Sequence, residues 1–170
     1  MQIIEKKTAS LMAMACVLGA IASDASAKQR ESIYQMGKIL GIAFQLTDDL
    51  IDYDSNANTG KMPFMDLKAK RFTLPLIHSL EKANATERKY MQDLILSHTQ
   101  SEDMEETICR FINKFGGMVY TRQKITLCYQ EILRMVQSSF PTSEYQLQMI
   151  TLVNELFHPH ILQTVTNNGR

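Results

Sequence analysis

Apolar residues recur at every third or fourth position along most of this chain, and that spacing limits its possible folds more than any other feature. The spacing matches the 3.6-residue turn of an α-helix. No stretch of the sequence shows the strict alternation of β-branched residues that is typical of strands. With only 7 Gly and 4 Pro in 170 residues, few positions interrupt such helices. The sequence therefore predicts an all-α protein.

Turn-forming residues divide the periodic pattern into separate helices. A polar cluster at 54–60 is followed by an expected loop at 61–71, and Thr73 is suited to cap the next helix. Gly116 and Gly117 mark the end of another helix. The expected helices are 11–22, 28–53, 74–82, 87–97, 101–115, 118–136 and 143–157, and the alternative for the last one is that it resumes after Pro159.

Length and charge narrow the classes of protein to consider. A chain of 170 residues forms one sizeable core, so we expect a single domain over residues 1–170. Eighteen basic and eighteen acidic side chains give no net charge. Proteins that bind nucleic acid or anionic membranes usually carry a basic excess, so we expect neither partner.

The cysteines and the N-terminal segment bear on localisation. Cys16, Cys109 and Cys128 are an odd number at wide spacing, which predicts free thiols in a reducing compartment, the cytoplasm. Residues 8–23 carry no charge and precede Ala-Ser-Ala, a pattern that also fits a secretory leader. The alternative is a helix buried on most of its circumference. The run is shorter than the roughly 20 residues that a transmembrane helix needs, so we expect no transmembrane segment.

Two glycines interrupt the helix expected at 28–53. Gly37 and Gly41 lie one turn apart, and each lowers helix propensity by up to about 1 kcal/mol relative to alanine. This cost predicts that the absence of a side chain at these two positions brings a compensating benefit. We expect another backbone, or a ligand, to approach the helix closely at these positions.

Three carboxylates stand at the end of the same helix. Asp48, Asp49 and Asp52 form a D-D-x-x-D pattern that places Asp48 and Asp52 on one face, with Gln45 one turn earlier. Hard oxygen ligands of this kind suit Mg²⁺, which takes one or two carboxylates together with substrate phosphates. The pattern predicts a magnesium site; the alternative is a solvated acidic helix end.

A basic segment follows the acidic one. Lys61, Lys68, Lys70 and Arg71 surround a single acid, Asp66. A metal-bridged diphosphate would need carboxylates for the metal and cations for the remaining phosphate oxygens. The alternative is ordinary salt bridging within the chain, which contributes little when exposed.

These motifs together resemble a known family. The segment 41–53 (GIAFQLTDDLIDY), followed by Thr-Gly-Lys at 59–61, Asp-Leu at 66–67 and FTLPLI at 72–77, is similar to the second aspartate-rich region of the trans-isoprenyl (polyprenyl) diphosphate synthases. Lys7-Thr8-Ala9 resembles that family's Lys-Thr segment, and Gly116-Gly117 its later Gly-Gly turn. The resemblance implies the C-terminal portion of an isoprenoid-synthase-type helical bundle.

The resemblance also implies roles for individual residues. Asp48, Asp49 and Asp52 would bind Mg²⁺, and Lys7 and Lys61 would contact the diphosphate of an allylic substrate. Arg71, where the family usually has lysine, would contact it too, while Thr8 and Gln45 would lie at the reacting centre. The implied reaction is the head-to-tail condensation of isopentenyl diphosphate with an allylic diphosphate, which yields a polyprenyl diphosphate.

One family feature is missing from the sequence. The family's first aspartate-rich motif lies upstream of the Lys-Thr segment, and no second D-D-x-x-D occurs in these 170 residues. We therefore expect the C-terminal half of a synthase that is inactive alone and works as a homodimer or with the missing N-terminal half. The alternative is a non-catalytic helical subunit, or a degenerate synthase, that acts as an interaction module.

Overall fold

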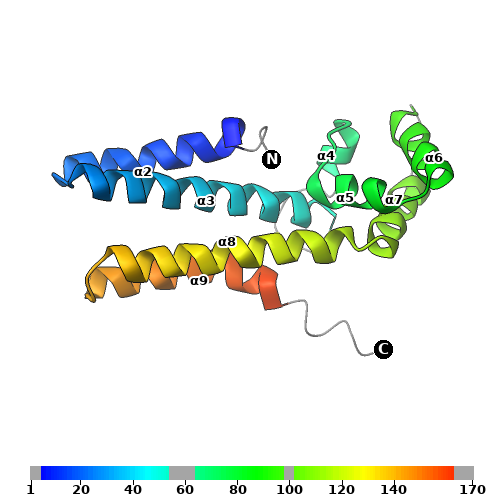
Figure 1. The fold of residues 1–170 in the computed structure, drawn as a ribbon. Coiled ribbons are helices and arrows are strands. Elements are labelled where there is room, and N and C mark those ends of the chain that lie inside the picture. The colour runs from blue at the N-terminus through cyan, green and yellow to red at the C-terminus, as the bar shows by residue number, and fades with distance from the viewer. Residues whose placement is uncertain (1–4, 54–63, 98–101, 163–170) are drawn as a thin grey trace. The chain divides into compact units, whose positions relative to one another are not determined.

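The computed structural model describes residues 5–53, 64–97 and 102–162, and every regular element in these ranges is a helix. Figure 1 shows their arrangement, which confirms the predicted all-α class. The elements are η1 (Glu5–Ala9), a turn of π-helix, and α2 (Ser10–Ala22), α3 (Ala27–Ile51), α4 (Met65–Lys68), α5 (Leu74–Lys82), α6 (Ala85–Leu96), α7 (Glu102–Lys114), α8 (Gly117–Ser139) and α9 (Glu144–Leu162).

The helix boundaries follow the prediction closely, with two differences. The segment 61–71 is not a continuous loop, because its described part contains the short helix α4. The last helix does not end at Phe157 but continues through Pro159 to Leu162.

Contacts divide the chain into two compact units. The first unit comprises Met1–Thr47 and Gln123–Arg170, and the second comprises Asp48–Arg122. Helices α3 and α8 each contribute to both units. The expected single domain stays a prediction.

In the first unit, α2 and α3 form an antiparallel hairpin with a very close contact (Figure 1). A Cβ atom added to Gly41 would lie 2.6 Å from the Cα of Ala9, and one added to Gly37 would lie 2.9 Å from the Cα of Ala13. Side chains at these two positions would therefore force the helices apart. The glycines admit another backbone, one of the two outcomes that their cost in helix propensity predicts.

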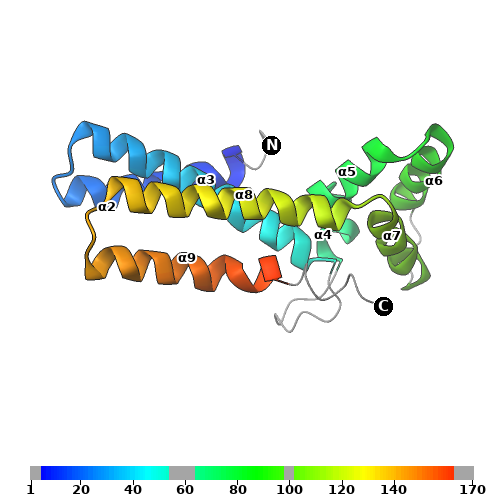
Figure 2. The same ribbon diagram turned by 60° about the horizontal axis from the view of Figure 1, so that its bottom comes forward.

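The same unit contains α9, which runs antiparallel to α8 (Figure 2). Gln146 ties the start of α9 to the end of α8, because its side-chain amide donates to the carbonyls of Phe140 at 2.9 Å and Val136 at 3.3 Å. Further along, the Tyr129 hydroxyl donates to Asn154 Oδ1 at 2.8 Å. These bonds fix the register of the two helices.

The second unit has its own apolar core, drawn from α4 to α7 and the residues beside them. Gly117 begins α8 directly against α5, since a Cβ atom there would collide with the carbonyl oxygen of Pro75. The core cluster consists of Tyr53, Phe64, Leu67, Leu76, Leu80, Ala83, Met91, Ile95, Met104, Ile108, Phe111 and Ile112.

Thr73 occupies the predicted N-cap position of α5, but its side chain makes no capping bond to the helix. Its hydroxyl instead lies 2.7 Å from the hydroxyl of Tyr53, and both side chains are buried. Burial and the nearby carboxylate of Asp52 raise the pKa of Tyr53. The bond therefore joins two neutral hydroxyls and ties the end of α3 to the start of α5.

Two further expectations concern the cysteines and the membrane. All three cysteines are free thiols and half-buried, as predicted. In the described part of the chain, no helix combines the length and the apolar character needed to cross a bilayer.

Candidate functional site

The three predicted metal ligands lie at the end of α3 and in the turn after it. Asp48 and Asp49 belong to the last turn of α3, and Asp52 follows the final helical residue. The Asp52 N–H still donates to the Asp48 carbonyl at 3.1 Å, so the helical path continues to this position. Asp49 is only 5% exposed, whereas Asp48 and Asp52 are half-buried. The helix thus separates one buried carboxylate from two that are partly accessible.

The Asp52 carboxylate organises the first residues of α4. Its Oδ1 accepts from the backbone N–H of Met65 at 2.9 Å, and its Oδ2 accepts from that of Asp66 at 3.0 Å. The Asp52 carbonyl also accepts from the N–H of Phe64 at 2.8 Å, and Phe64 has a left-handed backbone with φ of 62°. Asp52 therefore satisfies three donors that the start of a helix would otherwise leave unpaired.

Opposing effects act on the pKa of Asp52. Burial raises the pKa, and the neighbouring carboxylates of Asp66 and Asp48 raise it further. The two backbone hydrogen bonds from Asp66 and Met65 lower it, but the net shift is upward. A cation near these carboxylates would reverse the electrostatic part of this shift.

Arg71, one of the predicted diphosphate ligands, is held on the same segment by Asp66. Its Nη1 lies 2.9 Å from Asp66 Oδ1, and its backbone N–H donates to the Asp66 carbonyl at 2.8 Å. The Arg71 side chain remains 61% exposed, whereas that of Asp66 is only 15% exposed. Arg71 therefore presents an oriented guanidinium to solvent. The sequence indicates Asp66 as the single acid of this segment and as part of a family motif, but not as the partner of Arg71.

Two other cations of the basic segment bind elsewhere. Lys68 pairs with Glu105 on α7 at 3.1 Å, and Lys70 donates to the carbonyl of Leu96 at the end of α6 at 3.1 Å. Lys68 therefore forms a salt bridge within the chain, which was the alternative to diphosphate binding for the basic segment. Lys61, the remaining predicted diphosphate ligand, lies outside the described residues.

The two residues predicted at the reacting centre lie in the first unit and contact each other. Thr8 Oγ1 donates to Gln45 Oε1 at 2.9 Å across 37 residues of sequence. Thr8 and the exposed Lys7 belong to η1, and π-helical turns are frequent at functional sites. Gly41, one turn before Gln45, allows Ala9 to lie against α3 and so brings Thr8 beside Gln45.

The donor set can be tested against the predicted Mg²⁺. Among the residues that the structure describes, no three His, Cys, Asp or Glu side chains gather closely enough to hold a metal ion unaided. Mg²⁺ usually takes only one or two carboxylates and completes its shell with water and substrate phosphate. Asp48 and Asp52 offer hard oxygen donors of this kind, and each carboxylate oxygen of Asp52 retains a second lone pair. The residues therefore fit a site that substrate phosphate completes.

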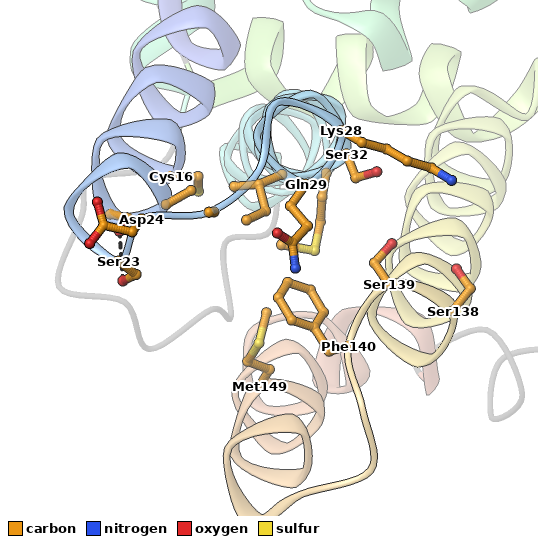
Figure 3. A pocket seen from close by; sticks show the side chains of 15 residues that line it. Cys16, Ser23, Asp24, Lys28, Gln29, Ser32, Ser138, Ser139, Phe140 and Met149 are labelled. Carbon is orange, nitrogen blue, oxygen red and sulfur yellow. Dashed lines mark hydrogen bonds between the residues drawn. The ribbon is translucent and has the colours of Figure 1, made fainter.

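A cavity of about 750 Å³ lies in the first unit (Figure 3). Residues of α2, α3 and α9 line it together with the end of α8, and Phe140 and Met149 lie close to each other there. No residue of the predicted site lines this cavity. The cavity is therefore distinct from the Thr8–Gln45 pair.

Comparison with known sequences identifies relatives. A family model described as "Polyprenyl synthetase" matches residues 1–112. The octaprenyl diphosphate synthase of Haemophilus influenzae is 29% identical over 153 residues, which cover 89% of this chain and 46% of that protein. The chain therefore spans about half the length of this curated relative.

Two solved structures match the fold of this chain over about half of their own length. A decaprenyl diphosphate synthase from Rhodobacter capsulatus matches with a TM-score of 0.82 and 26% identity, over 92% of this chain and 48% of that one. A geranylgeranyl pyrophosphate synthase from Corynebacterium glutamicum, solved with calcium and isoprenyl diphosphate, matches with a TM-score of 0.78. At 22% identity, over 92% of this chain and 48% of that one, the second match shows the fold alone.

Proposed function

Because this chain belongs to the polyprenyl synthetase family, we propose that it carries part of the active site of a magnesium-dependent prenyltransferase. The reaction is the head-to-tail condensation of isopentenyl diphosphate with an allylic diphosphate to give a polyprenyl diphosphate. The products in the names of its relatives, octaprenyl and decaprenyl diphosphate, support this class of reaction.

The observation that carries the proposal is the pair of hydrogen bonds that the Asp52 carboxylate accepts from the backbone N–H groups of Met65 and Asp66, the first residues of α4. Through it, the acidic end of α3 is joined to the segment on which Asp66 orients Arg71. One hydrogen-bonded unit thereby contains both a carboxylate for the metal, Asp52, and a cation for the phosphate, Arg71. A solvated acidic helix end would not need this connection.

Of the three predicted ligands, Asp48 and Asp52 would bind Mg²⁺ directly, and the buried Asp49 would add negative charge beside it. Mg²⁺ would supply positive charge to the diphosphate leaving group as it departs. Arg71, Lys61 and Lys7 would donate hydrogen bonds to its remaining oxygens, and arginine can do so through two parallel N–H groups. Stabilising this departing charge is the main task that the reaction gives to the protein.

Thr8 and Gln45 would act at the reacting carbon atoms rather than on the diphosphate. Their mutual hydrogen bond fixes both side chains, so two oxygen dipoles are oriented before substrate arrives. Oxygen dipoles of this kind stabilise an allylic carbocation until the isopentenyl double bond attacks it. Water has to be kept away from the cation, because it would otherwise be hydrolysed.

The chain spans about half the length of the relatives it matches, so the complete reaction would require the rest of the fold. A complementing N-terminal half would supply the missing part, whether or not the chain also forms a homodimer, and the 170 residues alone would not turn over substrate. The three free thiols support a reducing compartment, and we place the protein in the cytoplasm.

Calorimetric titration of the 170-residue chain with inorganic pyrophosphate, with and without Mg²⁺, tests the binding part of the proposal. We expect Mg²⁺-dependent binding that Asp48→Asn weakens at least about tenfold, since a hydrogen-bonded charge contributes about 1.5–3 kcal/mol. Asp93→Asn is the matched control, because this exposed aspartate of α6 pairs with Lys89 on its own helix. Binding that is absent, or unchanged by Asp48→Asn, would favour the non-catalytic helical subunit.

Incorporation of labelled isopentenyl diphosphate tests the catalytic part. We expect no product from the chain alone, and product when the first half of the Haemophilus influenzae synthase is added. Robust turnover by the chain alone would contradict the expected division of the site.

A further inference from the structure

Tyr53 lies directly after Asp52 and is held on two sides. Its buried hydroxyl is 2.7 Å from that of Thr73, the residue just before α5. Its ring meets the ring of Phe64, just before α4, edge to face, with centroids 6.3 Å apart and an interplanar angle of 72°. Tyr53 therefore joins the end of α3 to the starts of two other helices.

Asp52 lies where the regular helix has ended. Ile51 is the last residue of α3, and the Tyr53 N–H donates to the carbonyl of Leu50 at 3.3 Å, three residues back rather than four. Helix ends fray, because their last turn has few bonds to hold it. The helix alone therefore does not fix the main chain of Asp52, whereas contacts made by the next residue can.

The Thr73 hydroxyl serves this contact instead of its own helix. Thr73 stands at the N-cap of α5, where a hydroxyl ordinarily accepts from an N–H of the first turn, yet it makes no capping bond. A cap would stabilise α5 alone. The bond to Tyr53 instead fixes one segment relative to another, which is the property that a site built from two segments needs.

The Asp52 carboxylate is sensitive to a shift of its main chain. It accepts from the Met65 N–H through one oxygen and from the Asp66 N–H through the other, so both oxygens have fixed directions. The remaining lone pair of each oxygen is then directed as well, and a displaced main chain would turn it away from a metal ion. Residues that orient metal ligands typically change the metal affinity by about 10–100-fold when they are replaced.

We propose that Tyr53 is a positioning residue of the metal site, which fixes the main chain of Asp52 through its contacts with Thr73 and Phe64. This inference rests on the proposed function, because that function assigns Asp52 to Mg²⁺. Tyr53 itself would contact neither the metal nor the diphosphate, since its hydroxyl is buried against Thr73. Its effect is on the direction of the Asp52 carboxylate.

Three variants and a control separate positioning from stability. Tyr53→Phe removes one hydroxyl and leaves that of Thr73 buried without its partner. Adding Thr73→Val removes the second hydroxyl too, so part of the lost stability returns while the tie between α3 and α5 stays broken. Thr73→Ser keeps the hydroxyl. Ser79→Ala is the matched control, because it removes another buried hydroxyl of α5, one that donates to the carbonyls of Pro75 in α5 and Ile112 in α7.

The first measurement is calorimetric titration of the chain with inorganic pyrophosphate in the presence of Mg²⁺. We expect Tyr53→Phe and the double variant to weaken binding by about tenfold, the lower end of the range for residues that orient metal ligands. Thr73→Ser and Ser79→Ala should bind to within about twofold of the unsubstituted chain. If binding instead followed the stability measured in urea, so that the double variant recovered both, the role would be merely structural and the inference overturned.

Hydrogen exchange measured by NMR, without metal or pyrophosphate, gives an independent second measurement. The Asp52 carboxylate protects the amides of Met65 and Asp66. Both amides should exchange at least about tenfold faster in Tyr53→Phe and in the double variant, and at an unchanged rate in Ser79→Ala.

Unchanged exchange of the Met65 and Asp66 amides in Tyr53→Phe would overturn the inference. Pyrophosphate binding by the unsubstituted chain reports separately on the proposed function. If that chain bound no pyrophosphate, the proposed function would fail, and the exchange rates alone would decide whether Tyr53 positions Asp52.

Discussion

Asp52 holds the backbone N–H of Asp66 through Oδ2 at 3.0 Å, and so joins the end of α3 to the segment that carries Arg71. Asp52→Ala removes this bond and the parallel one to Met65. We expect it to lower the free energy of unfolding by about 1–3 kcal/mol, because hydrogen bonds to a charged group are lost. Urea denaturation followed by circular dichroism measures the change.

Asp52→Asn keeps one acceptor oxygen and should lose roughly half as much stability. Asp93→Ala serves as the control and should change the stability by less than about 0.5 kcal/mol, since exposed i,i+4 ion pairs contribute little. If Asp52→Ala behaved like this control, the Asp52 carboxylate would not hold α4 in solution.

The contact between Gly41 and Ala9 gives a second prediction. Alanine favours helix over glycine by up to about 1 kcal/mol, yet at position 41 its Cβ would lie 2.6 Å from the Ala9 Cα. Because a backbone atom cannot move aside alone, we expect Gly41→Ala to lower the free energy of unfolding by about 1–3 kcal/mol. Gly19→Ala on α2 meets no atom within 4 Å and should raise it. Equal effects at the two positions would mean that the α2–α3 contact is looser than described.

The hydrogen bond between Thr8 and Gln45 can be measured with a double-mutant cycle. Thr8→Val and Gln45→Leu each remove one partner, and the double variant removes both. We expect a coupling of about 0.5–1.5 kcal/mol in urea denaturation, the usual contribution of a neutral hydrogen bond. Additive losses would indicate that the two side chains do not bond in solution.

Cys109 should react slowly with alkylating agents. Burial, and to a smaller extent the carboxylate of Glu105, raises the pKa of Cys109 to about 11. Only the thiolate reacts, so at pH 8 the rate should be roughly a hundredfold below that of a thiol with a pKa of 9 and should rise up to about pH 11. Mass spectrometry of iodoacetamide-treated protein measures each site separately.

Glu105→Gln removes the negative charge beside Cys109 and should lower its pKa, so alkylation at pH 8 becomes faster. Cys128 is the internal reference, because burial raises its pKa while Lys124, a cation, lowers it. A rate at Cys109 that is independent of pH between 8 and 11 would contradict the assigned cause.

Local signals in the sequence were enough to place most helices. Helix α5 has the predicted bounds because Pro75 in its first turn and Asn84, which caps the next helix, mark both ends locally. Helix α4 was missed because its first turn depends on Asp52, more than ten residues earlier, and on a left-handed Phe64. No local propensity encodes a contact of that kind.

The candidate site also combines positions that the local sequence predicts with contacts that it does not predict. The D-D-x-x-D spacing placed Asp48 and Asp49 on the last turn of α3, as helical geometry requires. The partners of the cations were not predictable, because Lys68 pairs with a residue of α7 and Lys70 with a carbonyl at the end of α6. Composition reveals how many charges a segment has, whereas packing between helices determines where each one binds.

The bond from the Phe64 N–H to the Asp52 carbonyl has an evolutionary consequence. It holds the backbone of Phe64, just before α4, against that of Asp52, just after α3. Doubling the length of a closed loop costs only about 0.6 kcal/mol in chain entropy. An insertion between Asp52 and Phe64 should therefore cost little free energy, so a change of length there need not disturb the connection between the carboxylates on α3 and Arg71.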